Sequence, residues 1–186
     1  MLVLTLIILL LSPQPAQAYF RLQAQTVPYL VVPKTRVELR ASSSSSAPSA
    51  LQEFSKNVLD LVNRERKKKG LPALKSNPLL ERSAQAHADN MVKQKFFSHE
   101  SPDRAKPEDR IRAAGYFVKP CNCAVTFSYG ENIAKGQKTA KDVMTAWMNS
   151  KIHRDNILKR EFTDLGVGFA GGLWVQNFGG IAVERK

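Results

Sequence analysis

The sequence predicts a single α+β domain, and a change of pattern along the chain supports this prediction. From about residue 51 to residue 149, apolar side chains recur every three or four positions, as on the buried side of a helix. From residue 164 to residue 180 they alternate with other residues, as in β-strands. Residues 51–186 also have the length of one ordinary domain with its own core.

Four helices are expected, over roughly residues 54–69, 78–96, 107–114 and 139–149. Proline stands in the first turn of the second and third of these, and glycine follows the first and third. The side of the second helix that we expect to face the core consists of Leu79, Leu80, Ala84, Ala88, Met91 and Val92.

A β-hairpin is expected over residues 164–180, DLGVGFAGGLWVQNFGG. Gly171 and Gly172 supply a two-residue turn between two stretches of alternating residues. Helices before and around such strands favour helices that pack on a sheet, in an α+β or layered α-β-α domain.

The first 50 residues are expected to lie outside the domain. Residues 1–18 carry no charge and end in the small-residue triplet AQA, which is typical of a secretory signal peptide cleaved after Ala18. Their apolar run is too short for a transmembrane anchor, which needs about 20 residues. Residues 19–50 include five consecutive serines and show no helical period, as in a flexible leader. We therefore expect an extracellular protein.

The chain is strongly basic, with a formal net charge of +12. Such a field attracts polyanions and anionic surfaces. Export and the lack of any nucleic-acid-binding motif argue against nucleic acid as the partner. A solvated helix end or a binding patch would both explain the basic cluster at the end of the first helix, which is formed by Arg64, Arg66, Lys67, Lys68 and Lys69.

Cys121 and Cys123 are the only cysteines. A bridge between them in an oxidising compartment requires a tightly bent loop. The chain has no second cysteine pair to complete a metal site. We expect a local bridge or none.

Several motifs occur in a fixed order along the chain: HESP, GENIA, AWMNS, HRDNIL, GVG and WVQNFGG. This ordered set resembles the CAP superfamily, also called the SCP domain, and it is closest to the bacterial branch. The resemblance covers about residues 54–180. It implies a three-layer α-β-α sandwich.

The resemblance also implies a cleft lined by His99, Glu131 and His153, which in several members holds a divalent metal. Ser150 stands where animal and plant members have a second glutamate. Two imidazoles and one carboxylate suit Zn²⁺ with water in the fourth position. Because serine is a poor metal ligand and brings no negative charge, we expect weaker metal binding than in those members.

Other polar residues near these motifs are expected to have structural roles. Asn132, Arg154 and Asn156 suit the tying of loops and the orientation of the cleft histidines. His87, on the second helix, is expected at the helix surface as a boundary residue.

We expect a non-enzymatic binding protein, because the resemblance implies a lipid or sterol ligand beside the metal. Phe117, Val125, Phe127 and Tyr129 either line a groove for such a ligand or belong to the core, which we favour. One alternative is a cell-wall or matrix protein that binds anionic polysaccharide through its basic surface. A weak hydrolase or peptidase is a second alternative, although no HExxH or GxSxG motif is present.

Overall fold

The computed structural model describes residues 17–24, 50–118 and 122–185. In these ranges the helices are α1 (Ala50–Lys68), α2 (Pro78–Gln94), α3 (Pro107–Ala113), α4 (Ala140–Asn149) and α5 (Lys151–Ile157). The strands are β1 (Gln17–Ala24), β2 (Lys75–Ser76), β3 (Cys123–Lys135), β4 (Asp164–Ala170) and β5 (Leu173–Arg185).

The strands form one sheet in the order β1-β3-β5-β4-β2. All neighbours are antiparallel except β2 and β4, which are parallel. The predicted hairpin is confirmed as β4 and β5. Its turn residues Gly171 and Gly172 have φ values of 53° and 78°, the left-handed region in which glycine is favoured.

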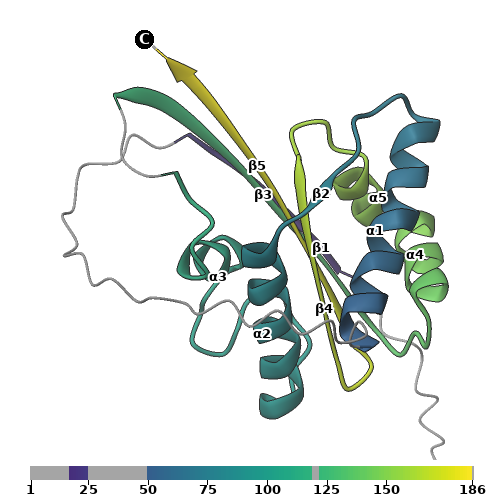
Figure 1. Cartoon of the computed structure of the whole chain (residues 1–186). Coiled ribbons are helices and arrows are strands. Elements are labelled where there is room, and N and C mark those ends of the chain that lie inside the picture. The colour runs from purple at the N-terminus through teal and green to yellow at the C-terminus, as the bar shows by residue number, and fades with distance from the viewer. Residues whose placement is uncertain (1–16, 25–49, 119–121, 186) are drawn as a thin grey trace, which may run out of the picture.

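Helices cover both faces of the sheet (Figure 1). α2 and α3 pack on one face, and α1, α4 and α5 pack on the other. The expected three-layer α-β-α sandwich is therefore confirmed. For brevity we call these the α2 face and the α1 face.

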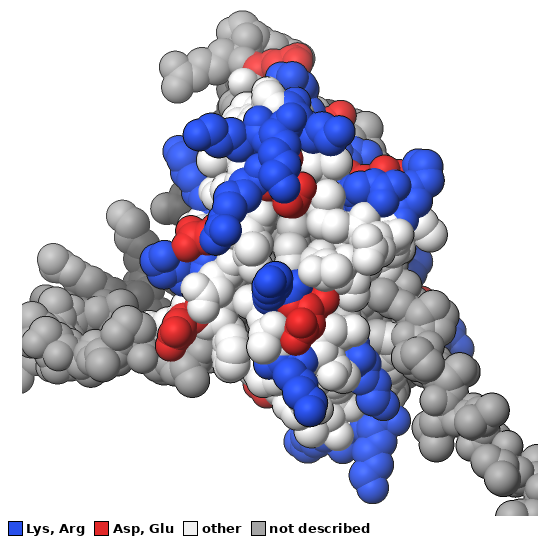
Figure 2. Space-filling view, turned by 90° about the vertical axis from the view of Figure 1, so that its right-hand side faces the viewer, with Lys and Arg blue, Asp and Glu red and all other residues white. Residues whose placement is uncertain are grey.

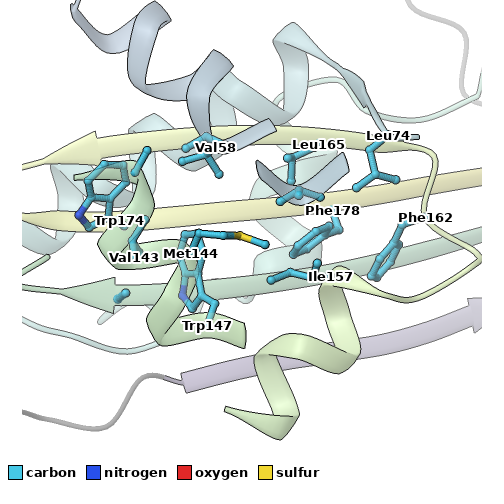
Figure 3. Close-up of a cluster of buried hydrophobic side chains, with 14 residues drawn as sticks. Val58, Leu74, Val143, Met144, Trp147, Ile157, Phe162, Leu165, Trp174 and Phe178 are labelled. Carbon is cyan, nitrogen blue, oxygen red and sulfur yellow. The ribbon is translucent and has the colours of Figure 1, made fainter. Parts of the chain in front are cut away.

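The larger core lies on the α1 face (Figure 3). Trp147 of α4 and Trp174 and Phe178 of β5 are fully buried there, together with Val58 of α1. Burying aromatic side chains of this size supplies a large share of the hydrophobic stabilisation of a domain.

On the α2 face, the helix lies directly on β4 because two glycines allow it. A Cβ atom at Gly166 would overlap the backbone of Leu80, and one at Gly168 would overlap the backbone of Ala84. The GVG motif thus sets how closely helix and sheet approach each other.

The four predicted helices are confirmed, but the helix α5 and the strands β1, β2 and β3 were missed. α5 begins only two residues after the end of α4, and β3 spans 13 residues around the GENIA motif. Val92, expected in the core, is 43% exposed.

The aromatic residues before and within β3 are divided. Phe127 and Tyr129 are core residues, as we favoured, whereas Phe117 is 56% exposed. Val125 is partly buried at the edge of the same cluster. Cys123 is disulfide-bonded, and Cys121, the only other cysteine of the chain, lies outside the described residues.

Part of the predicted flexible leader is a strand. Residues 17–24 form β1, which pairs with residues 126–133 of β3 and places Tyr19 opposite Glu131. The predicted cleavage point after Ala18 falls inside this strand. The rest of the predicted signal peptide and leader, residues 1–16 and 25–49, lies outside the described residues.

One member of the basic cluster at the end of α1 is not solvated. The Arg66 side chain is fully buried. Its guanidinium donates to the carbonyl oxygens of Pro72, Ile157, Lys159 and Phe162 at 2.7–3.2 Å. Arg66 therefore fixes the loop between α5 and β4 to the end of α1.

Candidate functional site: a buried histidine, glutamate and arginine cluster

The structure brings His99 and Glu131 together. His99 lies in the loop after α2, and Glu131 lies in the middle of β3. The Nδ1 atom of His99 is 2.8 Å from Oε1 of Glu131. The glutamate side chain is fully buried and the histidine side chain is 13% exposed, so this pair lies just beneath the surface.

The sequence analysis did not identify the third member of the cluster, Arg110 of α3. Its Nη2 atom donates to Oε2 of Glu131 and to the carbonyl oxygen of His99, both at 2.9 Å. Its Nη1 atom donates to the Ala105 carbonyl oxygen at 2.7 Å and to Ser101 Oγ at 3.2 Å. Contacts in several directions therefore hold the guanidinium in one orientation.

His87 is a fourth member, and its expected position at the helix surface is wrong. Its side chain is fully buried. Its Nε2 atom lies 3.0 Å from the carbonyl oxygen of Ser98 and 3.9 Å from Oε1 of Glu131. It faces the core because it lies one turn after Ala84 and one turn before Met91 on the inward side of α2. This spacing of three and four residues was the sequence signal that could have predicted a buried His87.

Asn177 of β5 completes the surroundings of Glu131, which it opposes across the β3–β5 pair. In the amide orientation that satisfies both of its ends, Asn177 donates to Oε2 of Glu131 at 3.0 Å and accepts from Ser83 Oγ at 3.0 Å. Glu131 thus has polar neighbours from the loop after α2, from α3 and from β5.

His153 belongs to the other face of the sheet. Glu131 and Asn132 are consecutive in β3, so their side chains point to opposite faces. Asn132 donates to the backbone carbonyl oxygen of His153 at 3.2 Å, and Asn156 donates to Asn132 Oδ1 at 2.9 Å. His153 and Asn156 lie on α5, which packs on the α1 face. The expected trio of His99, Glu131 and His153 is therefore not assembled as one group.

The remaining predicted residues lie around α5. Ser150 precedes the first turn of the helix, and its side chain makes no capping hydrogen bond. Arg154 donates to the carbonyl oxygen of Met148 at 2.7 Å, and Asn156 also donates to the backbone oxygen of Glu131 at 3.3 Å. Arg154 thus ties α5 to the last turn of α4, and Asn156 ties α5 to β3.

Glu131 is held as a carboxylate. Burial alone would raise the pKa of Glu131, but the hydrogen bond with His99 and the charge of Arg110 outweigh burial and lower it. Burial lowers the pKa of His87 and favours the neutral imidazole. The negative charge of Glu131 would raise this pKa, but its effect is smaller than that of burial. The cluster therefore contains a negative carboxylate and a positive guanidinium, which balance each other.

The fit to a divalent metal can be tested on these contacts. Within the described ranges, no three His, Cys, Asp or Glu side chains are arranged to hold a metal ion. His99 and Arg110 already engage the two oxygens of Glu131. The contacts of the described residues do not fit a metal bound by His99, Glu131 and His153.

Two grooves open on the surface nearby. One, of about 560 Å³, runs between α2 and α3 past Arg110 and Ser101. The other, of about 400 Å³, lies between the first turns of α1 and α2. Apolar side chains of the second groove come from Leu51, Leu59, Pro78, Leu165 and Val167.

Comparison with known proteins decides the family. The family described as "CAP: Cysteine-rich secretory protein family" matches residues 59–178. The chain belongs to this family. None of the helices in the described part of the chain combines the length and apolar character that a membrane span needs.

Two similar sequences come from a bacterium. "Uncharacterized protein YkwD" of Bacillus subtilis (strain 168) is 41% identical over 141 residues, covering 75% of this chain and 52% of the relative. "Uncharacterized membrane protein YlbC" of the same strain is 31% identical over 123 residues, covering 66% of this chain and 33% of the relative.

A solved structure with a similar fold also comes from a bacterium. The crystal structure of an extracellular protein containing an SCP domain from Bacillus anthracis str. Ames has a TM-score of 0.61 and 28% identity, covering 76% of this chain and 45% of that chain. This chain thus spans about half the length of YkwD and of the B. anthracis protein, and about a third of YlbC.

Proposed function

We propose that this CAP protein is a secreted, non-enzymatic binding protein that holds an anionic polymer of the cell envelope. The observation that carries the proposal is a basic surface beside the end of α1. We call it the α1-end surface, and it consists of Lys67, Lys68, Lys69, Lys159 and Arg160.

This surface is built on the buried Arg66. Lys67 and Lys68 are the last two residues of α1, and Lys69 directly follows the helix. The Arg66 guanidinium binds the carbonyl oxygen of Lys159 at 2.7 Å and so holds the loop that also carries Arg160. Because the backbone beneath these cations is fixed, a polymer that binds them does not have to order the loop.

Figure 2 views the molecule from the side of α1, α4 and α5, and Lys and Arg side chains gather in its upper part. Acidic neighbours only partly offset them. Lys68 is paired with Glu65 at 2.6 Å, and Glu161 lies in the loop after Arg160. A surface with this excess of cations attracts polyanions.

The relatives support a location at the cell envelope. One is named an extracellular protein and another a membrane protein. The signal peptide expected in residues 1–18 agrees with export.

The cluster around Glu131 argues against the hydrolase alternative. A general base needs an accessible carboxylate or imidazole with a pKa near the working pH. Glu131 is buried, its oxygens are engaged, and its pKa is lowered. Its carboxylate is therefore a weak base.

Binding to purified wall teichoic acid, measured against neutral dextran at low and high salt, tests the proposal. We expect binding only to the polyanion, and loss of it at high ionic strength. The test variant carries Lys67→Ser, Lys69→Ser and Arg160→Ser. The matched control removes three exposed cations elsewhere, with Lys93→Ser on α2, Lys135→Ser at the end of β3 and Lys138→Ser in the loop before α4.

The test variant should bind roughly tenfold more weakly or worse, because each exposed ion pair contributes up to about 1 kcal/mol. The control should keep most of the affinity. Equal losses in both variants would mean that only net charge matters, and would contradict a specific surface.

The groove between α1 and α2 favours a second candidate, a lipid or sterol ligand. Its apolar lining includes Leu51 and Leu59, with Lys56 and Arg82 at the rim. A fluorescent sterol should then bind with little dependence on salt, and Leu51→Ser with Leu59→Ser should weaken it. The serine variant of the α1-end surface is the control that should bind sterol normally.

A further inference from the structure

The cluster around Glu131 contains an arginine where the family resemblance led us to expect a metal ion. Arg110 lies on α3, a short helix that begins at Pro107. Its side chain is 12% exposed, and Glu131 beside it is fully buried. The pair is therefore almost completely removed from water.

The guanidinium is a fixed part of this site. It contacts Glu131 and the backbone oxygen of His99 through Nη2, and Ala105 and Ser101 through Nη1. A planar guanidinium with donors in several directions suits such a site better than a flexible ammonium group. The fold thus places the Nη2 atom of Arg110 at 2.9 Å from Oε2 of Glu131.

The charges of the site are balanced without any ion. Glu131 contributes one negative charge and Arg110 one positive charge. A divalent metal would add two positive charges to this balanced pair. An excess charge in a buried site costs several kcal/mol, so binding of the metal would be strongly disfavoured.

We propose that Arg110 serves as the fixed cation of this cluster and makes it independent of a divalent metal. This inference does not rest on the proposed binding of a polymer, because it concerns the opposite face of the sheet. It assigns Arg110 the electrostatic role that a metal ion has in a His and Glu site.

The proposal predicts that removal of Arg110 creates a metal site. On the α2 face, His99 lies 2.8 Å and His87 lies 3.9 Å from the same oxygen of Glu131. Two imidazoles and one carboxylate are a ligand set that suits Zn²⁺ once the competing cation is gone.

The experiment compares the full-length chain with Arg110→Met by thermal unfolding and by calorimetric titration with Zn²⁺. Without metal, the variant should unfold roughly 10 °C lower, because Glu131 is left as an unpaired buried charge. Zn²⁺ should restore part of this loss and bind saturably. The wild type should show neither a shift of Tm nor saturable binding.

The control carries Arg110→Met together with Glu131→Gln, which removes both charges. It should recover most of the Tm without metal and should not respond to Zn²⁺. This double variant also keeps the test valid if Arg110→Met alone does not fold. Saturable Zn²⁺ binding by the wild type that is lost in His99→Ala would overturn the proposal, and so would a double variant as unstable as Arg110→Met.

Discussion

Arg66 is fully buried and Arg110 is almost fully buried, on opposite faces of the sheet, and the two side chains are stabilised in different ways. Arg66 lies at the end of α1 and, in the described part of the chain, donates only to backbone carbonyl oxygens. Arg110 lies on α3 and donates to the carboxylate of Glu131 as well as to backbone. Arg66 therefore fastens one segment to another, whereas Arg110 neutralises a charge.

The two arginines also differ in the pKa that each site shifts. Burial, with a smaller effect of the Arg160 charge, lowers the pKa of Arg66, as expected for a cation without an acidic partner. Arg110 instead lowers the pKa of its partner Glu131. A buried arginine can thus serve as a structural fastener or as a counterion, and substitution should separate the two roles.

The largest effect is expected for Arg110→Met. This change leaves the Glu131 carboxylate buried without its cation, which costs about 3–5 kcal/mol. Urea unfolding at neutral pH measures the loss as a change in the free energy of unfolding. A loss below about 1 kcal/mol would show that the carboxylate does not depend on Arg110.

Arg66→Met should cost less, about 1–3 kcal/mol. It leaves carbonyl oxygens without a donor, but it strands no opposite charge. The same urea experiment applies, and the fall should be accompanied by faster hydrogen exchange in residues 157–162, which Arg66 holds. Exchange confined to other segments would contradict the fastening role.

Much of the fold was predictable because its signals are local. The period of the apolar residues, the prolines at helix starts and the Gly171-Gly172 turn each act within a few residues. β3 was missed because the buried segment FSYGENIA carries Gly, Glu and Asn, which do not resemble a core strand. α5 was missed because its seven residues are too few to show a period.

The site was predictable only in part, because its contacts join residues far apart in sequence. The family motifs supplied His99 and Glu131. Nothing local distinguishes Arg110 from the other charged residues of α3, and Arg66 looks like one member of a basic run. The partners of both arginines are created by the packing of the layers.

Replacing each arginine with lysine should sharpen the comparison. Arg110→Lys keeps the positive charge and loses hydrogen bonds, so it should cost about 1–2 kcal/mol, clearly less than Arg110→Met. Arg66→Lys cannot reach several carbonyl oxygens at once and should be nearly as destabilising as Arg66→Met. The ratio of lysine to methionine effects, from urea unfolding, distinguishes the counterion from the fastener.

Acid should affect the two sites differently. The folded-state pKa of Glu131 lies below its ordinary value of 4.5, so its contribution to stability is present above about pH 4.5 and is lost as pH falls through the folded pKa. Arg110→Met should raise that pKa, and the gap in stability between wild type and variant should narrow on acidification. The gap for Arg66→Met should stay constant from pH 7 to the same acidic pH. Parallel curves for both variants would contradict the assignment of Arg110 as the counterion.

The smallest effect is expected one residue after Arg66. Lys67 belongs to the same basic run, but its side chain is exposed, so Lys67→Met should change the free energy of unfolding by no more than about 0.5 kcal/mol. Binding to teichoic acid should nevertheless weaken, because the α1-end surface loses a cation. Adjacent residues of one run would then have separate roles, Arg66 in holding the loop and Lys67 in meeting the polymer. A loss of stability in Lys67→Met as large as that in Arg66→Met would mean that the whole basic run is structural. That result would contradict the assignment of the α1-end surface as a binding site.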